Sequence, residues 1–509
     1  MFSIHPSMWD FSSSIFFAIC AMVICSIQPP HCYDDKNRIY FLDLSRTSNK
    51  YQEMSLKVVI LIGGETTGTR FRPLSMDTPK VLFPIAGKPL ISHIVQKIAE
   101  LGEGELIEVF LLGYFTDLKP FDEYIAEAKK EYSNVNIKYL TEPYSMGTGG
   151  GLYYFRDEIF GDGTCEELLV IHGDIVCNYP FKELIQFYKK SNADSVIMGI
   201  NPLLLMNNYQ NKTQIQNHTP FKVYDNIDTF SKYGTIIANK SDSKIVHYVE
   251  KPSSKFSEFQ LQTEYNTLIN GGVYVFDKSI LEFLAKAQSH KSSKCKEYDR
   301  HNLDNESINS NVLSLELDVL KFLPEAKNRF LTYKSDSFWN QLKTPISALF
   351  ANIFFLEEYK KNHVCNPLAT PSDKVISPVR ASNFVTTSEN YIIGPNVSLG
   401  RNVKIGNGVR IKNCIISDNV TIGDNSFVAN AIISKDVKIG RWCRIEGTFT
   451  NDTTSKDINQ VRSDGYYKLI NNIVVLCQNT VVHNQVFVYN SIVLPHKELK
   501  NDVKYEIIM

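Results

Sequence analysis

The chain has 509 residues, enough for two or three domains that each bury a core. Its 54 basic and 55 acidic residues leave a formal net charge of −1, which predicts no overall attraction for nucleic acid or for a membrane surface. The ten cysteines include no Cys-x-x-Cys pair, a usage typical of reduced cytoplasmic thiols rather than of a disulfide framework or a zinc site.

The first apolar stretch, Ile15 to Ile27, is too short to cross a bilayer comfortably. No Lys or Arg precedes it, whereas a secretory signal carries a positive segment there. Met54 stands just before the first predicted strand. We therefore expect residues 1–53 to be an extension outside the fold, with a signal peptide as the alternative.

From Leu56 onward, short apolar runs alternate with amphipathic stretches. The runs that predict strands are Val58–Ile62, Leu106–Tyr114, Ile137–Tyr139, Leu168–Ile171 and Ser195–Gly199. The stretches that predict helices are Ile91–Leu101, Phe121–Glu131 and Ile346–Lys361. This alternation indicates an α/β domain over residues 54–361, with a mostly parallel, doubly wound sheet and ligands at the carboxyl ends of its strands.

Two polar segments interrupt this domain, near residues 203–231 and 289–311. Neither contains enough apolar residues to bury a face of its own. Both are expected to be mobile surface insertions without secondary structure.

After residue 361 the pattern changes to aliphatic residues at a spacing of six. The first register reads Ile393, Leu399, Ile405, Ile411, then Ile416, Ile422, Val428, then Ile433, Ile439, Ile445. Such a period predicts stacked short strands with one inward side chain per repeat, a β-solenoid over residues 362–509. A polar segment near residues 447–468 breaks the repeat before Ile473–Leu476 resumes it.

The stretch Val58 to Pro89 carries the strongest functional pattern. A buried strand runs into Gly63 and Gly64, and Gly68-Thr69-Arg70 follows a short turn. Glycines directly after a strand let backbone N–H groups approach a phosphate, and an arginine supplies a cationic fork. A plain glycine turn is the alternative, and the sequence is not a Walker loop, because Gly68 is not followed by Lys and Ser or Thr.

The continuation through Pro79-Lys80 and Gly87-Lys88-Pro89 resembles the signature of sugar-1-phosphate nucleotidyltransferases, and the solenoid resembles the left-handed hexapeptide β-helix. The resemblance implies phosphate contacts from Gly63, Gly64, Gly68 and Thr69 and catalytic roles for Arg70 and Lys80. It implies base, sugar and sugar-phosphate contacts from Gly147, Thr148, Gly149, Gly173, Gly234, Glu250, Lys251, Asn270 and Gly271. It also implies that Asp174 is the first Mg²⁺ ligand. Each motif alone has a structural explanation, but their shared order favours the functional one.

Three departures from the catalytic pattern bear on activity. Three residues, Glu65-Thr66-Thr67, stand where the resemblance implies one, and a carboxylate there repels a triphosphate. Val81 replaces a proline, which is a minor change. Gln341, two residues after Trp339, occupies the position of the second metal-binding aspartate in a Trp-x-Asp-Ile-Gly motif, and Lys343 replaces its glycine. Since Mg²⁺ prefers carboxylate oxygens, we expect the metal to be weakly held.

With these departures the chain is similar to the alpha, or regulatory, subunits of eukaryotic GDP-mannose pyrophosphorylase. The resemblance implies binding of GDP-mannose or a related nucleotide sugar, control of a catalytic beta subunit, self-association, and no binding of nucleic acid or membrane. An active mannose-1-phosphate guanylyltransferase is the first alternative. A hexapeptide-repeat acyltransferase, for which His483 would be the catalytic histidine, is a remote alternative. A translation-factor-like exchange subunit of similar architecture is a further one, but this sequence shows no pattern for the C-terminal helical domain that such a subunit carries.

Overall fold

The structure is a computed structural model that describes residues 56–65, 68–102, 105–161, 165–202, 233–252, 264–301, 312–325, 329–361, 369–382, 385–448 and 473–509. The expected extension (1–53), the first polar insertion (203–231) and most of the solenoid insertion (447–468) lie outside these residues. None of the helices in the described ranges is long and apolar enough to cross a membrane.

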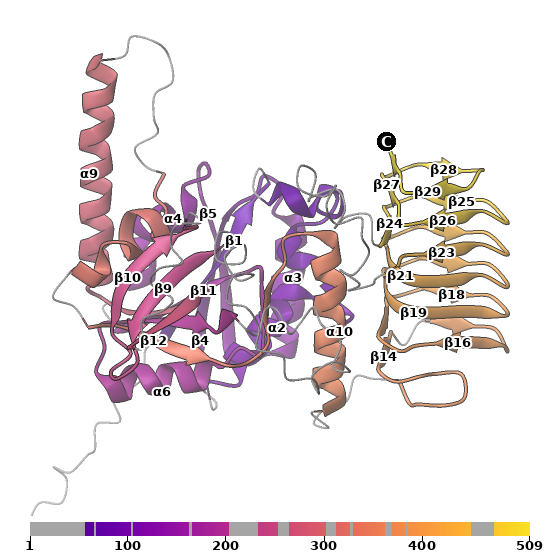
Figure 1. Ribbon diagram of the computed structural model, residues 1–509, viewed down its shortest axis with the longest axis horizontal. Coiled ribbons are helices and arrows are strands. Elements are labelled where there is room, and N and C mark those ends of the chain that lie inside the picture. Colours follow the sequence, from indigo (N-terminus) through magenta and orange to yellow (C-terminus); the bar gives the residue numbers. More distant parts are fainter. Residues whose placement is uncertain are drawn as a thin grey trace, which may run out of the picture. The chain divides into compact units, whose positions relative to one another are not determined.

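The N-terminal domain is built on a nine-stranded sheet (Figure 1). Its strands are β1 (Leu56–Gly64), β4 (Ile107–Tyr114), β5 (Val135–Thr141), β6 (Glu167–His172), β8 (Ser195–Ile200), β9 (Gly234–Asn239), β10 (Ile245–Glu250), β11 (Tyr265–Asp277) and β12 (Phe330–Ser335). The order is β10-β9-β11-β6-β1-β4-β5, and β8 pairs with β11 and β12. All five predicted strands and their order along the chain are confirmed.

The sheet is mixed, which corrects the expectation of a mostly parallel one. Strands β5, β4, β1 and β6 run parallel, as do β8 and β12, but β11 pairs antiparallel with β6, β8 and β9. Strands β9 and β10 are joined by a short connection, and short connections produce antiparallel hairpins. Because β1 and β6 are parallel, their carboxyl ends meet at one edge of the sheet.

The helices of the domain are α2 (Leu90–Ala99), α3 (Lys119–Glu131), α4 (Gly147–Tyr154), α5 (Arg156–Phe160), α6 (Phe181–Ser191), α9 (Ile280–His301) and α10 (Pro345–Lys361). A six-residue π-helical turn, η8 (Leu315–Leu320), packs against α4, and short 3-10 turns are η2 (Thr69–Phe71), η3 (Leu74–Met76), η4 (Lys80–Leu82) and η9 (Leu323–Glu325). Two small ladders complete the domain: β2 (Pro84–Ile85) with β3 (Lys88–Pro89), and β7 (Ile175–Cys177) with β13 (Trp339–Gln341).

Helix α9 corrects a second expectation. Residues 289–301, predicted to be an unstructured insertion, continue the helix to His301 (Figure 1). The stretch is polar, but its lysine, glutamate and arginine residues are good helix formers, and a helix already started extends at little cost. The ammonium of Lys291 also contacts the Asp318 carboxylate of η8 at 3.0 Å.

The C-terminal domain is a stack of parallel coils (Figure 1). One sheet contains β14 (Val379–Ala381), β16 (Tyr391–Ile393), β17 (Val397–Leu399), β19 (Val409–Ile416), β21 (Phe427–Ile433), β23 (Arg444–Glu446), β24 (Val474–Leu476), β26 (Phe487–Tyr489), β27 (Ile492–Val493), β29 (Val503–Lys504) and β30 (Ile507–Ile508). A second contains β15 (Thr386–Thr387), β18 (Lys404–Ile405), β20 (Thr421–Ile422), β22 (Lys438–Ile439), β25 (Val481–Val482) and β28 (Glu498–Leu499).

The register of the coils confirms the six-residue pattern. Ile405 stands beside Ile422, and Ile422 beside Ile439, with all three side chains buried in the solenoid core. The next partner of Ile439 is Val482, so strands on either side of the polar segment pair in the same register.

Helix α10 joins the two domains. Its buried side chains share one core cluster with outward aliphatic residues of the solenoid, among them Ile415, Ile432 and Val475. The side-chain oxygen of Asn352 accepts hydrogen bonds from the Ala86 backbone N–H at 2.9 Å and from the Ser398 hydroxyl at 2.7 Å. The hairpin β2–β3, α10 and the solenoid are therefore held at one buried amide.

Candidate functional site

The predicted phosphate loop lies at the carboxyl end of β1. Gly63 and Gly64 are the last residues of that strand, and Gly68 precedes η2 with a left-handed backbone (φ 69°). The left-handed backbone favours glycine at this position, and a Cβ atom there would lie 3.5 Å from the ammonium of Lys80, so the loop runs beside the lysine. Thr69 and Arg70 are exposed in η2.

Asp174 lies beside this loop because β6 runs parallel to β1. The Gly173 backbone N–H donates to the Leu61 carbonyl at 2.9 Å, which places the turn after β6 against the end of β1. The Asp174 carboxylate accepts from the Lys80 ammonium at 2.6 Å, and both side chains are largely buried. Burial opposes ionisation, but Lys80 and its neighbours outweigh it and lower the pKa of Asp174 to about 2.

Gln341 completes this cluster. Strand β13 pairs antiparallel with β7, with Gln341 opposite Ile175, and the Leu342 N–H donates to the Asp174 carbonyl at 2.7 Å. The Gln341 amide nitrogen donates to both carboxylate oxygens of Asp174, at 3.0 and 3.2 Å. The structure thus brings together the two positions that the sequence suggested as a metal pair.

Lys343 follows two residues later and is half-buried. Its ammonium lies 4.2 Å from the centre of the Tyr233 ring. Burial lowers the pKa of Lys343 to about 8, and the charge of Arg70 acts in the same direction, against that of Asp174. Removing a lysine from water without an ion-pair partner accounts for the direction.

A second polar cluster lies on β9, β10 and β11. Asn270 donates to the hydroxyls of Tyr248 and Tyr274, both at 3.0 Å, and the Tyr248 hydroxyl donates to Glu250 at 2.9 Å. A Cβ atom at Gly234 would lie 2.2 Å from the Tyr248 hydroxyl, so only glycine fits there.

Two more predicted residues border this cluster. The Glu250 carboxylate contacts the Lys251 ammonium at 3.4 Å. The Gly271 carbonyl accepts from the Trp339 ring N–H at 2.9 Å, so β11 is tied to the start of β13.

The third predicted group, Gly147 to Gly149, forms the first turn of α4 rather than an open loop. The backbone N–H of Gly149 donates to the Leu313 carbonyl at 3.0 Å. The Thr148 hydroxyl donates to the Glu316 carboxylate at 2.6 Å. These groups therefore contact the segment that leads into η8.

Glu316, which sequence reasoning missed, joins the clusters. Its carboxylate lies 3.2 Å from His172, at the end of β6, and the His172 ring nitrogen lies 3.4 Å from the Tyr274 hydroxyl. Burial opposes both charges, but each group stabilises the other, so the pKa of Glu316 is lowered to about 2 and that of His172 is raised. The hydrogen-bonded polar side chains therefore form a continuous row from Asn270 to His172, two residues before Asp174. This row, together with Glu250, is called the polar wall below. No local pattern marks Glu316, because its partners are distant in sequence.

The fit of Mg²⁺ can be tested on Asp174. Its carboxylate oxygens are already hydrogen-bonded by Lys80 and Gln341. In the part of the chain that the structure describes, no group of three or more His, Cys, Asp and Glu side chains could hold a metal ion. Mg²⁺ requires oxygen ligands in near-octahedral geometry, so the residues present do not fit it.

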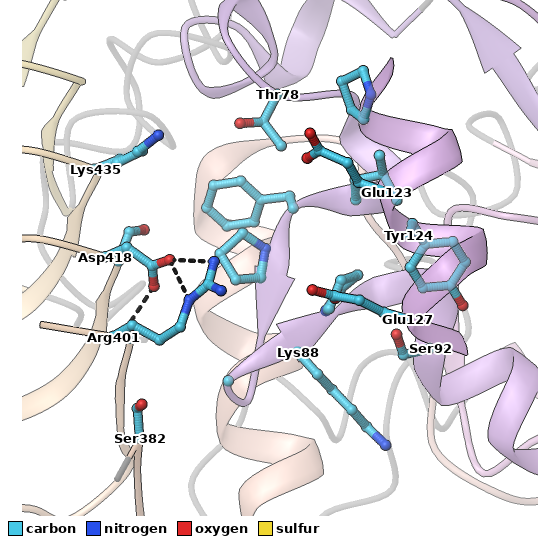
Figure 2. Close-up of a pocket in the computed structure, with 18 of the residues that line it drawn as sticks. Thr78, Lys88, Ser92, Glu123, Tyr124, Glu127, Ser382, Arg401, Asp418 and Lys435 are labelled. Carbon is cyan, nitrogen blue, oxygen red and sulfur yellow. Dashed lines mark hydrogen bonds and ion pairs between the residues drawn. The ribbon is translucent and has the colours of Figure 1, made fainter. Parts of the chain in front are cut away.

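A separate cavity of about 850 Å³ lies between α3 and the edges of the solenoid coils. Figure 2 shows Glu123 and Glu127 on the α3 side and Arg401, Asp418 and Lys435 on the solenoid side. Arg401 and Asp418 form an ion pair at 2.9 Å. Both signs of charge line the cavity, and Gly68, Lys80 and Asp174 do not, so it is distinct from the site described above.

The remote acyltransferase alternative finds no support at His483. This residue follows β25 on an exposed edge of the solenoid, and its ring contacts the Glu498 carboxylate. His483 is not among the residues that line the cavity between α3 and the solenoid.

Comparison with known proteins agrees with this geometry. The nucleotidyl transferase family matches residues 57–210 and 205–340, and the family described as the GMPPB C-terminal domain matches residues 375–508. Together they define a nucleotidyltransferase domain followed by a second, separate family domain.

The relatives narrow the class further. The chain is 34% identical over 473 residues to the mannose-1-phosphate guanylyltransferase regulatory subunit alpha of Drosophila melanogaster, covering 89% of this chain and 100% of that protein. It is 31% identical over 462 residues to the Xenopus tropicalis protein of the same name, with the same coverage. A probable mannose-1-phosphate guanyltransferase of Schizosaccharomyces pombe is 33% identical over 460 residues, covering 90% of this chain and 100% of that protein. The chain belongs to the mannose-1-phosphate guanylyltransferase family and is a homologue of its regulatory alpha subunits.

Proposed function

We propose that the chain is a regulatory subunit of GDP-mannose pyrophosphorylase, which binds GDP-mannose and controls a catalytic beta subunit in a cytoplasmic hetero-oligomer. The observation that carries the proposal is the contrast between its two clusters. The polar wall around Glu250 and Asn270 offers carboxylate, amide and hydroxyl groups that suit sugar hydroxyls. The carboxylate that would hold Mg²⁺ is occupied instead by Lys80 and Gln341.

The chemistry of nucleotidyl transfer explains how a chain can bind GDP-mannose without catalysing its synthesis. Nucleotidyl transfer needs a metal to neutralise charge at the attacked phosphorus, and losing one stabiliser of developing charge costs about 10²–10³ in rate. Binding a finished nucleotide sugar needs no such developing charge. The names of the alpha-subunit relatives support a regulatory role, and self-association is part of the same proposal.

The test compares turnover with binding in the full chain. Purified chain with GTP, mannose 1-phosphate and Mg²⁺ should release pyrophosphate at or below the detection limit, yet bind GDP-mannose by titration calorimetry. Added to the beta subunit, it should strengthen inhibition by GDP-mannose.

A matched pair of variants locates the site. Glu250→Gln should weaken GDP-mannose binding about tenfold, in line with loss of a hydrogen bond to a charged group. Glu325→Gln makes the same chemical change at an exposed position in η9 and should leave binding unchanged. Robust Mg²⁺-dependent pyrophosphate release by the chain alone would contradict the proposal.

That contrary result is the signature of the second candidate, an active mannose-1-phosphate guanylyltransferase. The name of the Schizosaccharomyces pombe relative, at 33% identity, favours it. An active enzyme would need another group to replace the second carboxylate, so its activity should fall steeply when Asp174 is changed to Asn.

A further inference from the structure

The charges around Asp174 have a balance of their own. The cations that interact with one another there are Arg70, Lys80, Lys251 and Lys343. The carboxylates are Asp174 and Glu250, and Glu250 is the ion-pair partner of Lys251. His172 and Glu316 pair at 3.2 Å and cancel. Among these six groups the cations exceed the carboxylates by two charges, and by one when the ionised Glu65 of the neighbouring turn is included. The surplus is positive, the sign that attracts the two phosphates of a nucleoside diphosphate sugar.

Lys343 differs from Lys80 and Lys251 in this balance, because those two lysines already have carboxylate partners. Lys80 contacts Asp174 at 2.6 Å, and Lys251 contacts Glu250 at 3.4 Å. Lys343 has no carboxylate within ion-pair distance among the described residues, and the contact that positions its ammonium is the face of the Tyr233 ring at 4.2 Å. An aromatic face stabilises a cation without neutralising it, so the charge remains available to a ligand.

The backbone holds Lys343 at this place. Strand β13 is registered on β7, and the Leu342 N–H donates to the Asp174 carbonyl at 2.7 Å. The next hydrogen bond, from the Lys343 N–H to the Ser347 hydroxyl at 3.0 Å, marks the entry to α10. The side chain of Lys343 is therefore attached next to a residue that is hydrogen-bonded to the Asp174 backbone, and its charge interacts with that of Asp174.

We propose that this chain binds a nucleoside diphosphate sugar without a divalent cation, with the Lys343 ammonium supplying the positive charge that a metal supplies in metal-dependent sites. The inference rests on the proposed function and specifies how the same site meets the diphosphate. The proposal follows from the poor fit of Mg²⁺ to Asp174. A metal ion would have to displace both Lys80 and Gln341 from the Asp174 carboxylate. It would also add two positive charges to a site whose charge is already positive and so already attracts a diphosphate.

The test measures binding of GDP-mannose to the full chain by titration calorimetry, once with EDTA and once with excess MgCl₂. The dissociation constants in the two buffers are expected to agree within about twofold, because no metal ion takes part in binding. Lys343→Met should weaken binding about tenfold in both buffers, as loss of one charge-assisted contact predicts. Lys343→Arg should retain most of the affinity.

Lys334→Met is the matched control. It removes the same charge from an exposed lysine of β12, whose ammonium contacts Asp336 at 3.4 Å, and should leave binding unchanged. The double variant Gln341→Asp/Lys343→Gly exchanges two charges and should bind GDP-mannose only when Mg²⁺ is present. Thermal unfolding of each variant without ligand establishes that it folds.

The outcomes separate the two proposals. Binding that disappears in EDTA and returns with Mg²⁺ would overturn the metal-free inference and leave the proposed function intact. Unchanged affinity of a folded Lys343→Met variant would overturn the role of this lysine. Absence of GDP-mannose binding in both buffers would overturn the proposed function, and the inference with it.

Discussion

The side-chain amide nitrogen of Gln341 donates to both carboxylate oxygens of Asp174, at 3.0 and 3.2 Å. A carboxylate at position 341 would face Asp174 and repel it. The neutral amide instead stabilises the ionised form of Asp174, in concert with Lys80. One residue type therefore converts a pair suited to a divalent cation into a closed network of hydrogen bonds.

The single variant Gln341→Asp should make stability depend on Mg²⁺. Two adjacent carboxylates repel in the absence of a cation, so we expect the melting temperature to fall by about 1–4 °C in EDTA and to recover in MgCl₂. Gln341→Asn, which keeps the charge, should show no difference between the buffers. Equal melting temperatures of Gln341→Asp in both buffers would contradict this reading of the pair.

Turnover should not return with Gln341→Asp alone, because the long turn after Gly64 still distorts the phosphate loop. The Glu65 carboxylate accepts from the Thr116 N–H at 2.7 Å, and its hydrogen bonds to Thr116 lower its pKa, so it stays ionised at neutral pH. Shortening this turn together with Gln341→Asp is expected to give measurable GDP-mannose synthesis, detected as pyrophosphate release.

Glu142 should make the domain less stable as the pH rises. Its side chain is 7% exposed and accepts only a long hydrogen bond, 3.3 Å from the Met146 N–H, and burial raises its pKa to about 7. Because the folded-state pKa exceeds the unfolded value, the stabilisation is complete below pH 4.5 and is lost as the pH rises to 7. Glu142→Gln should therefore raise the melting temperature by about 1–3 °C at pH 8 and change it little at pH 4.5. An equal effect at both pH values would contradict the assignment.

Lys88 provides the opposite sign of pH dependence. Its ammonium donates to the Gln96 side chain at 2.6 Å, and burial, followed by the charge of Arg380, lowers its pKa to about 8. The folded state then binds fewer protons than the unfolded state between pH 8 and 10.5, so stability rises across that window. Lys88→Met should raise the melting temperature at pH 7 but not at pH 10.5. Lys97→Met, which removes the same charge from an exposed lysine of the adjoining helix α2, is the control.

Asn352 should be needed to hold the two domains together. Asn352→Leu leaves the buried Ala86 N–H and Ser398 hydroxyl without an acceptor, which costs about 2–4 kcal/mol of unfolding free energy. Ser398→Ala removes only one donor and should cost about 1 kcal/mol. Chemical denaturation of both variants measures the difference, and similar midpoints for the two would contradict the shared role of this amide.

Deletion of residues 1–53 should leave unfolding and GDP-mannose binding unchanged. The compact unit that contains both domains begins at Met54, and its first strand begins at Leu56. Thermal unfolding with and without GDP-mannose, on the full and the shortened chain, checks this. Loss of the ligand-induced shift in the shortened chain would show that the extension belongs to the site.

The sequence by itself determined the features that repeat or follow one another locally. Alternating runs predicted β1, β4, β5, β6 and β8, and a six-residue period predicted the coils, because such patterns reflect which face of each element is buried. The order of motifs indicated the family, and the identity of residue 341 showed that a neutral glutamine stands at this position.

Only the tertiary structure decided which side chains these residues contact. Gln341 and Asp174 are 167 residues apart, as far as Thr148 is from Leu315, and no local pattern encodes such a meeting. The antiparallel half of the sheet, the continuation of α9 to His301 and the buried place of Glu316 also escaped prediction. Each depends on partners supplied by distant strands and turns, and the free energy of those contacts outweighs the weak local preferences that a sequence displays.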